Sequence, residues 1–295
     1  MNKSYKRTDL AKELKSDDII SGSNSHGISY TEQLENGFEI SVLDILNDQG
    51  AEIIGKPCGK YITIDTGKVW TMSEENFDRL TNLLSREIKK MLLEACKKSE
   101  FDSILVAGLG NRYITSDALG HETVKNVIVT RHIKDIKPDI YTALGGKSVS
   151  AITPGVIGQT GIETLEIIRG ATENVRPDAV IVIDALAASD LSHLATTVQI
   201  TDTGISPGSG IGNKRLAINK ESLNCPVIAI GVPTVVESST LVYGALSEAG
   251  ISEISNELKR VLDNGRGFFV TPKESDIVTE ELSRLIADSI NLALS

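Results

Sequence analysis

The sequence predicts an α/β fold in which helices flank a mostly parallel central sheet. Four short apolar runs, at residues 104–107, 127–129, 179–183 and 227–230, lack the alternation of half-exposed strands. Such runs are typical of strands buried on both faces of a parallel sheet. Helical apolar patterns lie between them. No repeat or linker divides the 295 residues beyond position 30, so we expect a single domain with a large core.

The first elements can be assigned in chain order. Residues 1–30 are polar and rich in Ser, Gly and Asn, so we expect a mobile arm rather than core. Alternating side chains predict strands at 38–43 and 61–65. A long helix should follow Ser73, which can cap it, and two glutamates suit the dipole of its first turn. Its apolar face consists of Phe77, Leu80, Leu84, Ile88, Met91 and Ala95.

Three later helices are predicted from signals at their N-termini. Residues 160–163 (Thr-Gly-Ile-Glu) and 234–237 (Thr-Val-Val-Glu) have the spacing of a capping box ahead of apolar periodic segments. Pro272 suits the first position of a last helix, which should run through Leu282 to the end of the chain.

Composition excludes several classes of protein. A formal net charge of −10 repels phosphates and anionic lipids, so we expect no direct nucleic-acid partner and no membrane partner. The sequence has no apolar stretch of 18 residues and no secretory signal. Cys58, Cys96 and Cys225 are scattered without metal-ligand spacing, which suits a reducing compartment. We therefore expect a cytoplasmic protein.

Two acidic residues stand where parallel strands should end. Asp184 directly follows the apolar run 179–183, where burial would raise its pKa. Asp117 lies beyond the turn Gly-Leu-Gly-Asn at 108–111, at the start of the next helix. Ligands bind at the carboxyl edge of parallel strands, so we expect both carboxylates in one cleft. One can take a proton from water while the other protonates a leaving group, which suits hydrolysis of a peptide bond.

Other interpretations of these segments remain open. Asp117 alone could be a helix N-cap. The 108–111 turn could cradle a phosphate, but Tyr113 stands where the dinucleotide fingerprint requires glycine. The glycine-rich loop at 203–213 is either a flexible connection or a wall of the substrate cleft, and its serine lacks the spacing of a nucleophile elbow. The four histidines show no paired metal-binding spacing: His26, His121, His132 and His193.

The chain resembles the germination proteases of spore-forming Firmicutes in an ordered set of motifs. The set starts with the 108–111 turn and with Asp-Ala-Leu-Gly at 117–120, and it extends from about residue 7 to residue 294. The further motifs are Thr-Pro-Gly at 153–155, Gln-Thr-Gly-Ile-Glu-Thr at 159–164, Val-Ile-Asp-Ala-Leu-Ala at 182–187, Thr-Asp-Thr-Gly at 201–204, Pro-Gly-Ser-Gly at 207–210, Gly-Val-Pro-Thr-Val-Val at 231–236 and Val-Thr-Pro-Lys at 270–273. Residues 189–193 depart from an Arg-containing pattern of the family.

The resemblance implies a fold similar to that of the maturation endopeptidases of nickel–iron hydrogenases. It implies an endopeptidase that cleaves small acid-soluble spore proteins during germination, in the spore core. It also implies a homotetramer that is made as an inactive zymogen and uses no cofactor. The two catalytic aspartates of the family map onto Asp117 and Asp184.

The resemblance also gives the N-terminal arm a role. Family substrates are cut after an acidic residue that follows Thr and precedes an apolar residue and Ala. Residues 8–13, Thr-Asp-Leu-Ala-Lys-Glu, imitate that site. We therefore predict self-cleavage between Asp9 and Leu10, which would divide the chain into a propeptide of residues 1–9 and a single peptidase domain of residues 10–295. The alternative is a disordered terminus, which composition alone does not exclude.

Further expectations concern the groups around the two aspartates. Backbone amides near Gly108, Gly110 and Asn111 could stabilise an oxyanion, and the loop containing Gly208 and Gly210 could shape the substrate cleft. We expect no bound metal, although carboxylates do bind hard cations and a metal-assisted version of the site remains open. Two rival functions also remain open, a metal-sensing peptidase of the hydrogenase-maturation type and a module associated with nucleotides or DNA.

Overall fold

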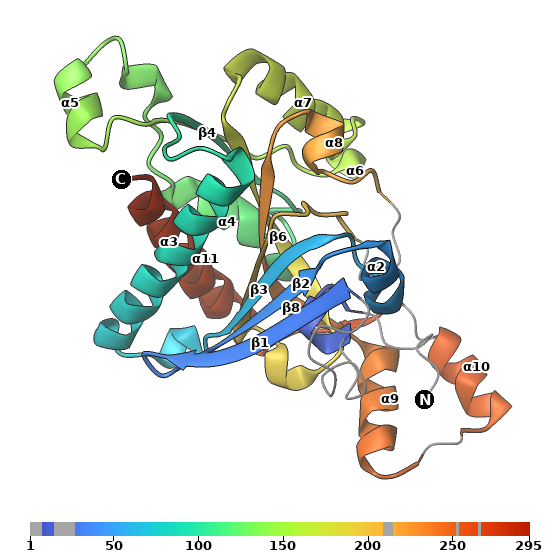
Figure 1. Cartoon of the computed structure of the whole chain (residues 1–295). Coiled ribbons are helices and arrows are strands. Elements are labelled where there is room, and N and C mark those ends of the chain that lie inside the picture. The colour runs from blue at the N-terminus through green and yellow to red at the C-terminus, as the bar shows by residue number, and fades with distance from the viewer. Residues whose placement is uncertain (1–7, 15–26, 209–214, 252–253, 265–266) are drawn as a thin grey trace.

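The computed structural model describes residues 8–14, 27–208, 215–251, 254–264 and 267–295. Within these ranges, nine strands form one sheet in the order β1-β2-β3-β7-β8-β6-β4-β5, and β9 pairs with β8 (Figure 1). The strands are β1 (Ile28–Glu35), β2 (Phe38–Ile45), β3 (Gly59–Asp65), β4 (Ser103–Gly108), β5 (Ser148–Ile152), β6 (Ala179–Ala188), β7 (Thr197–Thr201), β8 (Val227–Glu237) and β9 (Phe269–Val270).

The sheet is mixed rather than mostly parallel. Strands β5, β4, β6 and β8 run parallel, and they include three of the apolar runs that predicted a parallel sheet. The other five pairings, β1–β2, β2–β3, β3–β7, β7–β8 and β8–β9, are antiparallel. The prediction of an α/β fold with a central sheet flanked by helices is confirmed. Its parallel character holds for one half of the sheet.

Helices cover both faces of the sheet. They are α2 (Asp48–Ile54), α3 (Glu74–Cys96), α4 (Leu119–Asn126), α5 (Pro138–Ala143), α6 (Ile157–Thr160), α7 (Thr164–Val175), α8 (Lys220–Leu223), α9 (Ser238–Glu248), α10 (Asn256–Asn264) and α11 (Ser275–Leu294). Short 3-10 helices are η2 (Ala11–Leu14), η4 (Val69–Thr71), η5 (Thr115–Asp117), η6 (Arg131–Ile133) and η7 (Leu191–His193).

One face is closed by α3, α4 and α11. The backbone N–H of Asn76 donates to the hydroxyl of Ser73, which caps α3 as predicted, and Lys97 ends the helix in the left-handed conformation. The apolar face of α3 packs with α11 against the sheet in the largest buried cluster. Burial of this stripe, rather than propensity alone, stabilises a helix of this length.

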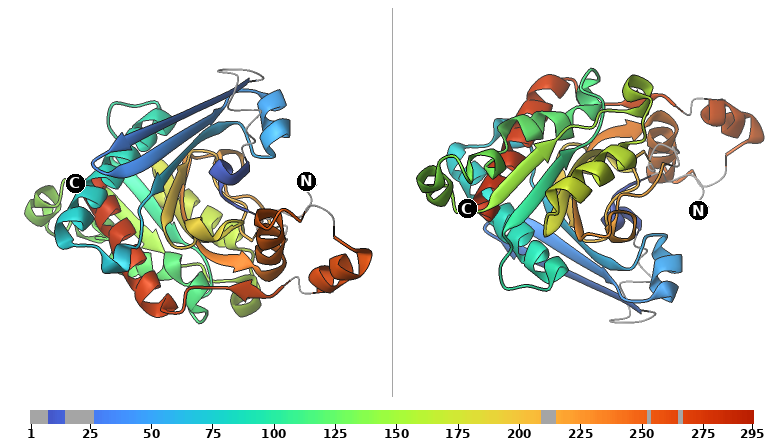
Figure 2. Two further views of the ribbon diagram at one scale, coloured as in Figure 1. Left: turned by 90° about the horizontal axis from the view of Figure 1, so that it is seen from below. Right: turned by 90° about the horizontal axis from the view of Figure 1, so that it is seen from above.

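The opposite face is covered in two separate places. Helices α7 and α8 pack on β4 and β6, while α2 and η2 pack on β1, β2 and β3. Strand β7 and the middle of β8 lie between these two groups. Figure 2 shows η2 between strands β1–β3 and the centre of the sheet. A pocket lined by Asp9, Lys56, Gln199 and Gly231 lies here, and we call it the hollow. The candidate site lies in this hollow.

Several local predictions were wrong. Residues 127–129 form no strand, and residues 234–237 continue β8 instead of capping a helix. The last helix begins at Ser275, so Pro272 precedes it. Residues 8–14 pack on the body of the protein, and Leu10 and Ala11 are fully buried; the rest of the predicted arm up to residue 26 lies outside the described residues. Among the described residues, no helix is long and apolar enough to cross a membrane.

Candidate active site

Asp184 projects from β6 on the face of the sheet that carries the hollow. Its neighbours in register are Gly231 on β8 and, beyond it, Gln199 on β7. The residue is 5% exposed, and the backbone N–H of Ala185 donates to its Oδ1 at 3.0 Å. Because Gly231 has no side chain, nothing from β8 rises between the carboxylate and the amide. The side chain of Leu186 packs over this glycine.

Asp117 is held beside the middle of β6 by a tight turn. The backbone N–H of Leu109 donates to the carbonyl of Ile183 at 2.8 Å, which docks the turn beside Asp184. Gly110 has a φ of +95°, and a Cβ there would lie 1.9 Å from the carbonyl oxygen of Asp117. The backbone N–H of Asn111 donates to Oδ2 of Asp117 at 2.9 Å. The turn therefore fixes the half-buried carboxylate in one orientation.

The two carboxylates act on each other electrostatically. Burial raises the pKa of Asp184 well above its usual value, and the negative charges of Asp117 and Asp9 raise it further. Burial also raises the pKa of Asp117, against opposing effects of the Asn111 N–H and of Arg215. The stronger upward shift of the pKa at Asp184 favours a state in which Asp184 keeps its proton while Asp117 is ionised. This state suits general acid–base chemistry.

The N-terminal segment lies beside the end of β6. The backbone N–H of Asp9 donates to the carbonyl of Ala187 at 2.8 Å, and the N–H of Ala187 donates back to Oδ2 of Asp9 at 3.0 Å. The side chain of Leu10 is buried among Leu186, Ala188 and Val236. The segment is thus bound by one backbone hydrogen bond, one hydrogen bond to the Asp9 carboxylate and an apolar anchor.

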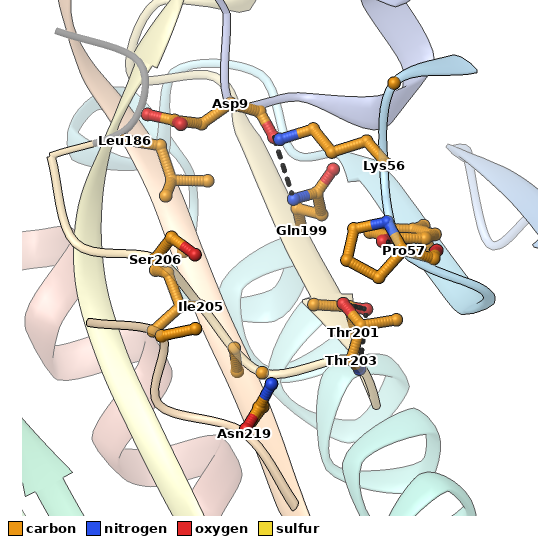
Figure 3. Close-up of a pocket in the computed structure, with 16 residues that line it drawn as sticks. Asp9, Lys56, Pro57, Leu186, Gln199, Thr201, Thr203, Ile205, Ser206 and Asn219 are labelled. Atoms are coloured by element: carbon orange, nitrogen blue, oxygen red, sulfur yellow. Dashed lines mark hydrogen bonds between the residues drawn. The ribbon is translucent and has the colours of Figure 1, made fainter. Parts of the chain in front are cut away.

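The carbonyl of Asp9 is surrounded by two side-chain donors. Lys56 Nζ lies 3.1 Å from this oxygen and Gln199 Nε2 lies 3.3 Å from it, and the two side chains converge on Asp9 in Figure 3. Burial lowers the pKa of Lys56, while the charge of Asp9 opposes the shift. The Oε1 of Gln199 accepts the N–H of Ala11 at 2.7 Å. Hydrogen bonds therefore hold the segment at the carbonyl of the Asp9–Leu10 peptide bond and at the N–H of Ala11.

A cavity of about 220 Å³ continues from Asp9 along the sheet. Its wall includes Gly231, Thr201 and Thr203 on one side and Ile205 and Ser206 on the other (Figure 3). The hollow therefore extends beyond the part that residues 8–14 occupy.

The glycines singled out from the sequence have different surroundings. Gly108 lets α4 approach β4, because a Cβ there would lie 2.0 Å from the carbonyl oxygen of Gly120. Gly110 and Asn111 position Asp117, as described above. Gly208 occupies a turn with a φ of +72°, two residues after the cavity wall at Ser206. Gly210 lies outside the described residues.

Two residues at this site were missed from the sequence. Gln199 carried a signal, since an amide in the middle of a fully buried strand requires a polar partner. Lys56 carried none, because it lies on a loop after α2 and reaches Asp9 only through the fold. Within the described ranges, no group of three or more His, Cys, Asp or Glu side chains is arranged to hold a metal ion.

Comparison with known proteins shows which family the chain is similar to. The family model described as Germination protease matches residues 6–249. A germination protease of Caldanaerobacter subterraneus subsp. tengcongensis is 40% identical and the alignment covers 98% of this chain and 94% of the relative; one from Clostridium acetobutylicum is 39% identical with the same coverage. Among solved structures, the nickel–iron hydrogenase maturation protease HycI of Thermococcus kodakarensis is 19% identical with a TM-score of 0.35, covering 65% of this chain and 94% of that one.

The class of protein follows from these relatives: the chain is a peptidase, a hydrolase that acts on protein substrates. More particularly, it belongs to the germination protease family.

Proposed function

We propose that this chain is the zymogen of an endopeptidase that cleaves small acid-soluble spore proteins when spores germinate, and that it first cleaves itself between Asp9 and Leu10. The observation that supports this most directly is the seating of residues 8–13 in the hollow, with the Asp9 carbonyl between Lys56 and Gln199. On this proposal residues 1–9 are a propeptide and residues 10–295 are the peptidase domain. The enzyme works as a homotetramer in the spore core.

The two aspartates divide the proton transfers of hydrolysis. Asp117 is the base, because the Asn111 N–H and Arg215 favour its ionised form. It takes a proton from a water molecule whose oxygen attacks the carbonyl carbon of Asp9. Asp184 is the acid, because burial and neighbouring negative charge keep its proton on. It gives that proton to the nitrogen of Leu10 as the C–N bond breaks. Asp117 then releases its proton and Asp184 takes one up, which restores the pair.

The carbonyl oxygen of the cut bond becomes negative in the transition state. Lys56 and Gln199 already donate to this oxygen in the seated segment, so they can stabilise the developing charge. The Gly108–Asn111 turn, which was expected to provide oxyanion donors, contributes through Asp117, since the Asn111 amide is committed to that carboxylate. Ile205 and Ser206, which line the cavity just before Gly208, form a wall of the substrate cleft; Gly210 lies outside the described residues.

Replacement of each aspartate tests the catalytic pair. Asp117→Asn and Asp184→Asn should each stop self-cleavage while the protein stays folded, because Asn can neither take nor release the proton. Asp139→Asn, an exposed change on α5, is the matched control and should process normally. N-terminal sequencing of the processed wild-type chain should give Leu10 as the first residue. Full processing in either active-site variant, or a different first residue, would refute the assignment.

The substrate is tested separately. A small acid-soluble spore protein that contains Thr-Glu followed by Phe or Ile and Ala is incubated with the processed chain, and fragments are mapped by mass spectrometry. A single cut after that Glu is expected. Cutting at unrelated positions, or no cutting by a chain that has processed itself, would contradict the proposed substrate class.

A further inference from the structure

The short segment that carries Asp117 has little of its own to hold it in place. It is η5, a 3-10 helix of three residues, and among the described residues no side chain caps its N-terminus. All three of its residues are at least partly exposed, and a 3-10 turn has poor internal hydrogen-bond geometry. The Asn111 N–H orients the carboxylate of Asp117, but the backbone of η5 needs anchors from outside.

Two threonine hydroxyls supply such anchors. The Oγ1 of Thr234, on β8, donates to the carbonyl of Ser116 at 2.5 Å. The Oγ1 of Thr279, on α11, donates to the carbonyl of Thr115 at 3.2 Å. These two carbonyls belong to the residues directly before Asp117. Thr234 is 3% exposed and Thr279 is 4% exposed, so water cannot readily take the place of either hydroxyl.

The position of Thr234 in its strand is irregular. Leu186 of β6 pairs with Pro233, but the next residue, Ala187, pairs with Val235. Thr234 is therefore the extra residue of a β-bulge. A bulge interrupts the regular alternation of a strand, and next to an active site it can redirect a side chain. Here the redirected hydroxyl reaches the backbone of η5.

Thr279 also directs its hydroxyl out of its own element. A threonine inside a helix often donates to the carbonyl four residues earlier in the same helix. Thr172 does so in α7, where its hydroxyl lies 2.8 Å from the carbonyl of Ile168. The hydroxyl of Thr279 instead leaves α11 and binds Thr115. A strand and a helix that are far from η5 in the sequence thus both hold its backbone.

We propose that Thr234 and Thr279 are positioning residues, which hold the backbone of η5 so that Asp117 keeps its place in the catalytic pair. They donate to the carbonyls of residues 115 and 116 and act on the reaction only through Asp117. This inference rests on the proposed function, because it takes Asp117 as the base of hydrolysis. It also gives a purpose to the irregular pairing of β6 with β8.

Replacement of the hydroxyls tests the proposal in the full-length chain. Valine keeps the shape of threonine but cannot donate, so Thr234→Val should slow self-cleavage about ten- to a hundredfold. Thr279→Val should slow it about three- to tenfold, because its bond is longer. Thr234→Ser keeps the donor and should process near the wild-type rate. Thr172→Val removes a similarly buried hydroxyl on α7 and should process at the wild-type rate.

A second measurement follows the position of Asp117 without any cleavage. The Asn111 N–H donates to the Asp117 carboxylate, so a displaced carboxylate should speed hydrogen exchange of this amide. Exchange is measured by NMR in the full-length Asp184→Asn chain, which should not process itself. In that background Thr234→Val and Thr279→Val should each speed exchange at Asn111 about tenfold, and Thr172→Val should leave it unchanged.

The outcomes separate the positioning role from the chemistry. Wild-type rates in both Thr234→Val and Thr279→Val overturn the role, and so does a Thr172→Val chain that is slowed as much. A Thr234→Ser chain as slow as Thr234→Val would show that the hydroxyl is not what matters. If Thr234→Val does not fold in urea-unfolding controls, Thr279→Val and Thr234→Ser decide.

Failure of the proposed function gives a different result. If the wild-type chain never processes itself, the proposed function fails, while exchange at Asn111 still decides on the two threonines. Unchanged exchange at Asn111 in both valine variants overturns their positioning role, whatever the cleavage rates are.

Discussion

Gly110→Ala is the substitution that most directly tests whether the position of Asp117 matters. The added methyl group would start 1.9 Å from the carbonyl oxygen of Asp117 and 3.0 Å from its Oδ1. Cβ atoms essentially never lie closer than 3.0 Å to such a neighbour. The backbone at Asp117 must therefore retreat by about 1.1 Å, and a displacement of about 1 Å in a catalytic group can lower a rate about a hundredfold.

Gly37→Ala supplies the matched control. Gly37 joins β1 to β2 with a φ of +87°, close to the +95° of Gly110, but a Cβ there meets nothing within 4 Å. Both variants force alanine into the left-handed region at a cost of about 1 to 2 kcal/mol in the free energy of unfolding. Only Gly110→Ala also moves Asp117.

The assay follows the rate at which the full-length chain converts to the processed form, together with urea unfolding of each variant. Gly37→Ala should process at the wild-type rate in spite of its lower stability. Gly110→Ala should process about a hundredfold more slowly. If the two variants process equally fast while both remain folded, the placement of Asp117 by this turn has no part in the chemistry, and the reasoning is refuted.

Two further predictions concern buried charge. Asp184→Asn should raise the free energy of unfolding at neutral pH by about 1.4 kcal/mol for each unit by which folding raises the pKa. The sign follows because folding raises the pKa of Asp184, so above the ordinary aspartate pKa the carboxyl group destabilises the folded protein. The gain in the variant should disappear at lower pH, where the carboxyl is protonated in both the folded and the unfolded state. Urea unfolding that finds the variant less stable than wild type at pH 7 would contradict this. Lys56→Met should slow self-cleavage about a hundred- to a thousandfold if Lys56 stabilises the oxyanion. Lys60→Met, which removes an ion pair with Glu94 and weaker interactions with Asp44 and Asp202, should not slow it, and equal rates in the two variants would exclude the role of Lys56.

Local patterns in the sequence predicted the parts of the fold that depend on neighbours in the chain. Helix α3 follows from its cap and its apolar stripe, and β6 follows from an apolar run that ends at Asp184. The same reasoning failed at residues 127–129 and 234–237, where a three-residue apolar run proved too short to define a strand and a capping-box spacing lay inside β8. Such short patterns fit a helix, a strand or a loop equally well, and contacts with other parts of the chain decide which one forms.

The arm shows why composition can mislead. Residues 8–14 are polar overall, and a polar segment is expected to stay in water. Two apolar side chains, Leu10 and Ala11, are nevertheless fully buried, and the polar ones meet fixed partners such as Ser189 and His193. Those partners lie more than 170 positions away, so no local pattern could have indicated them.

The sequence by itself determined the α/β class and the main helices, and it singled out Asp117 and Asp184, because these depend on periodicity and burial over a few residues. The expectation that both follow the ends of strands was wrong, since Asp184 lies within β6 and Asp117 lies in η5, beyond the turn that follows β4. Only the tertiary structure decided that the sheet is mixed, that Asp117 and Asp184 sense each other's charge, and that Lys56 and Gln199 meet at the Asp9 carbonyl. These features arise from strand pairings and side-chain contacts between distant segments, such as β3 with β7 and Asp9 with Gln199. The energy of such contacts depends on the whole fold rather than on any one segment.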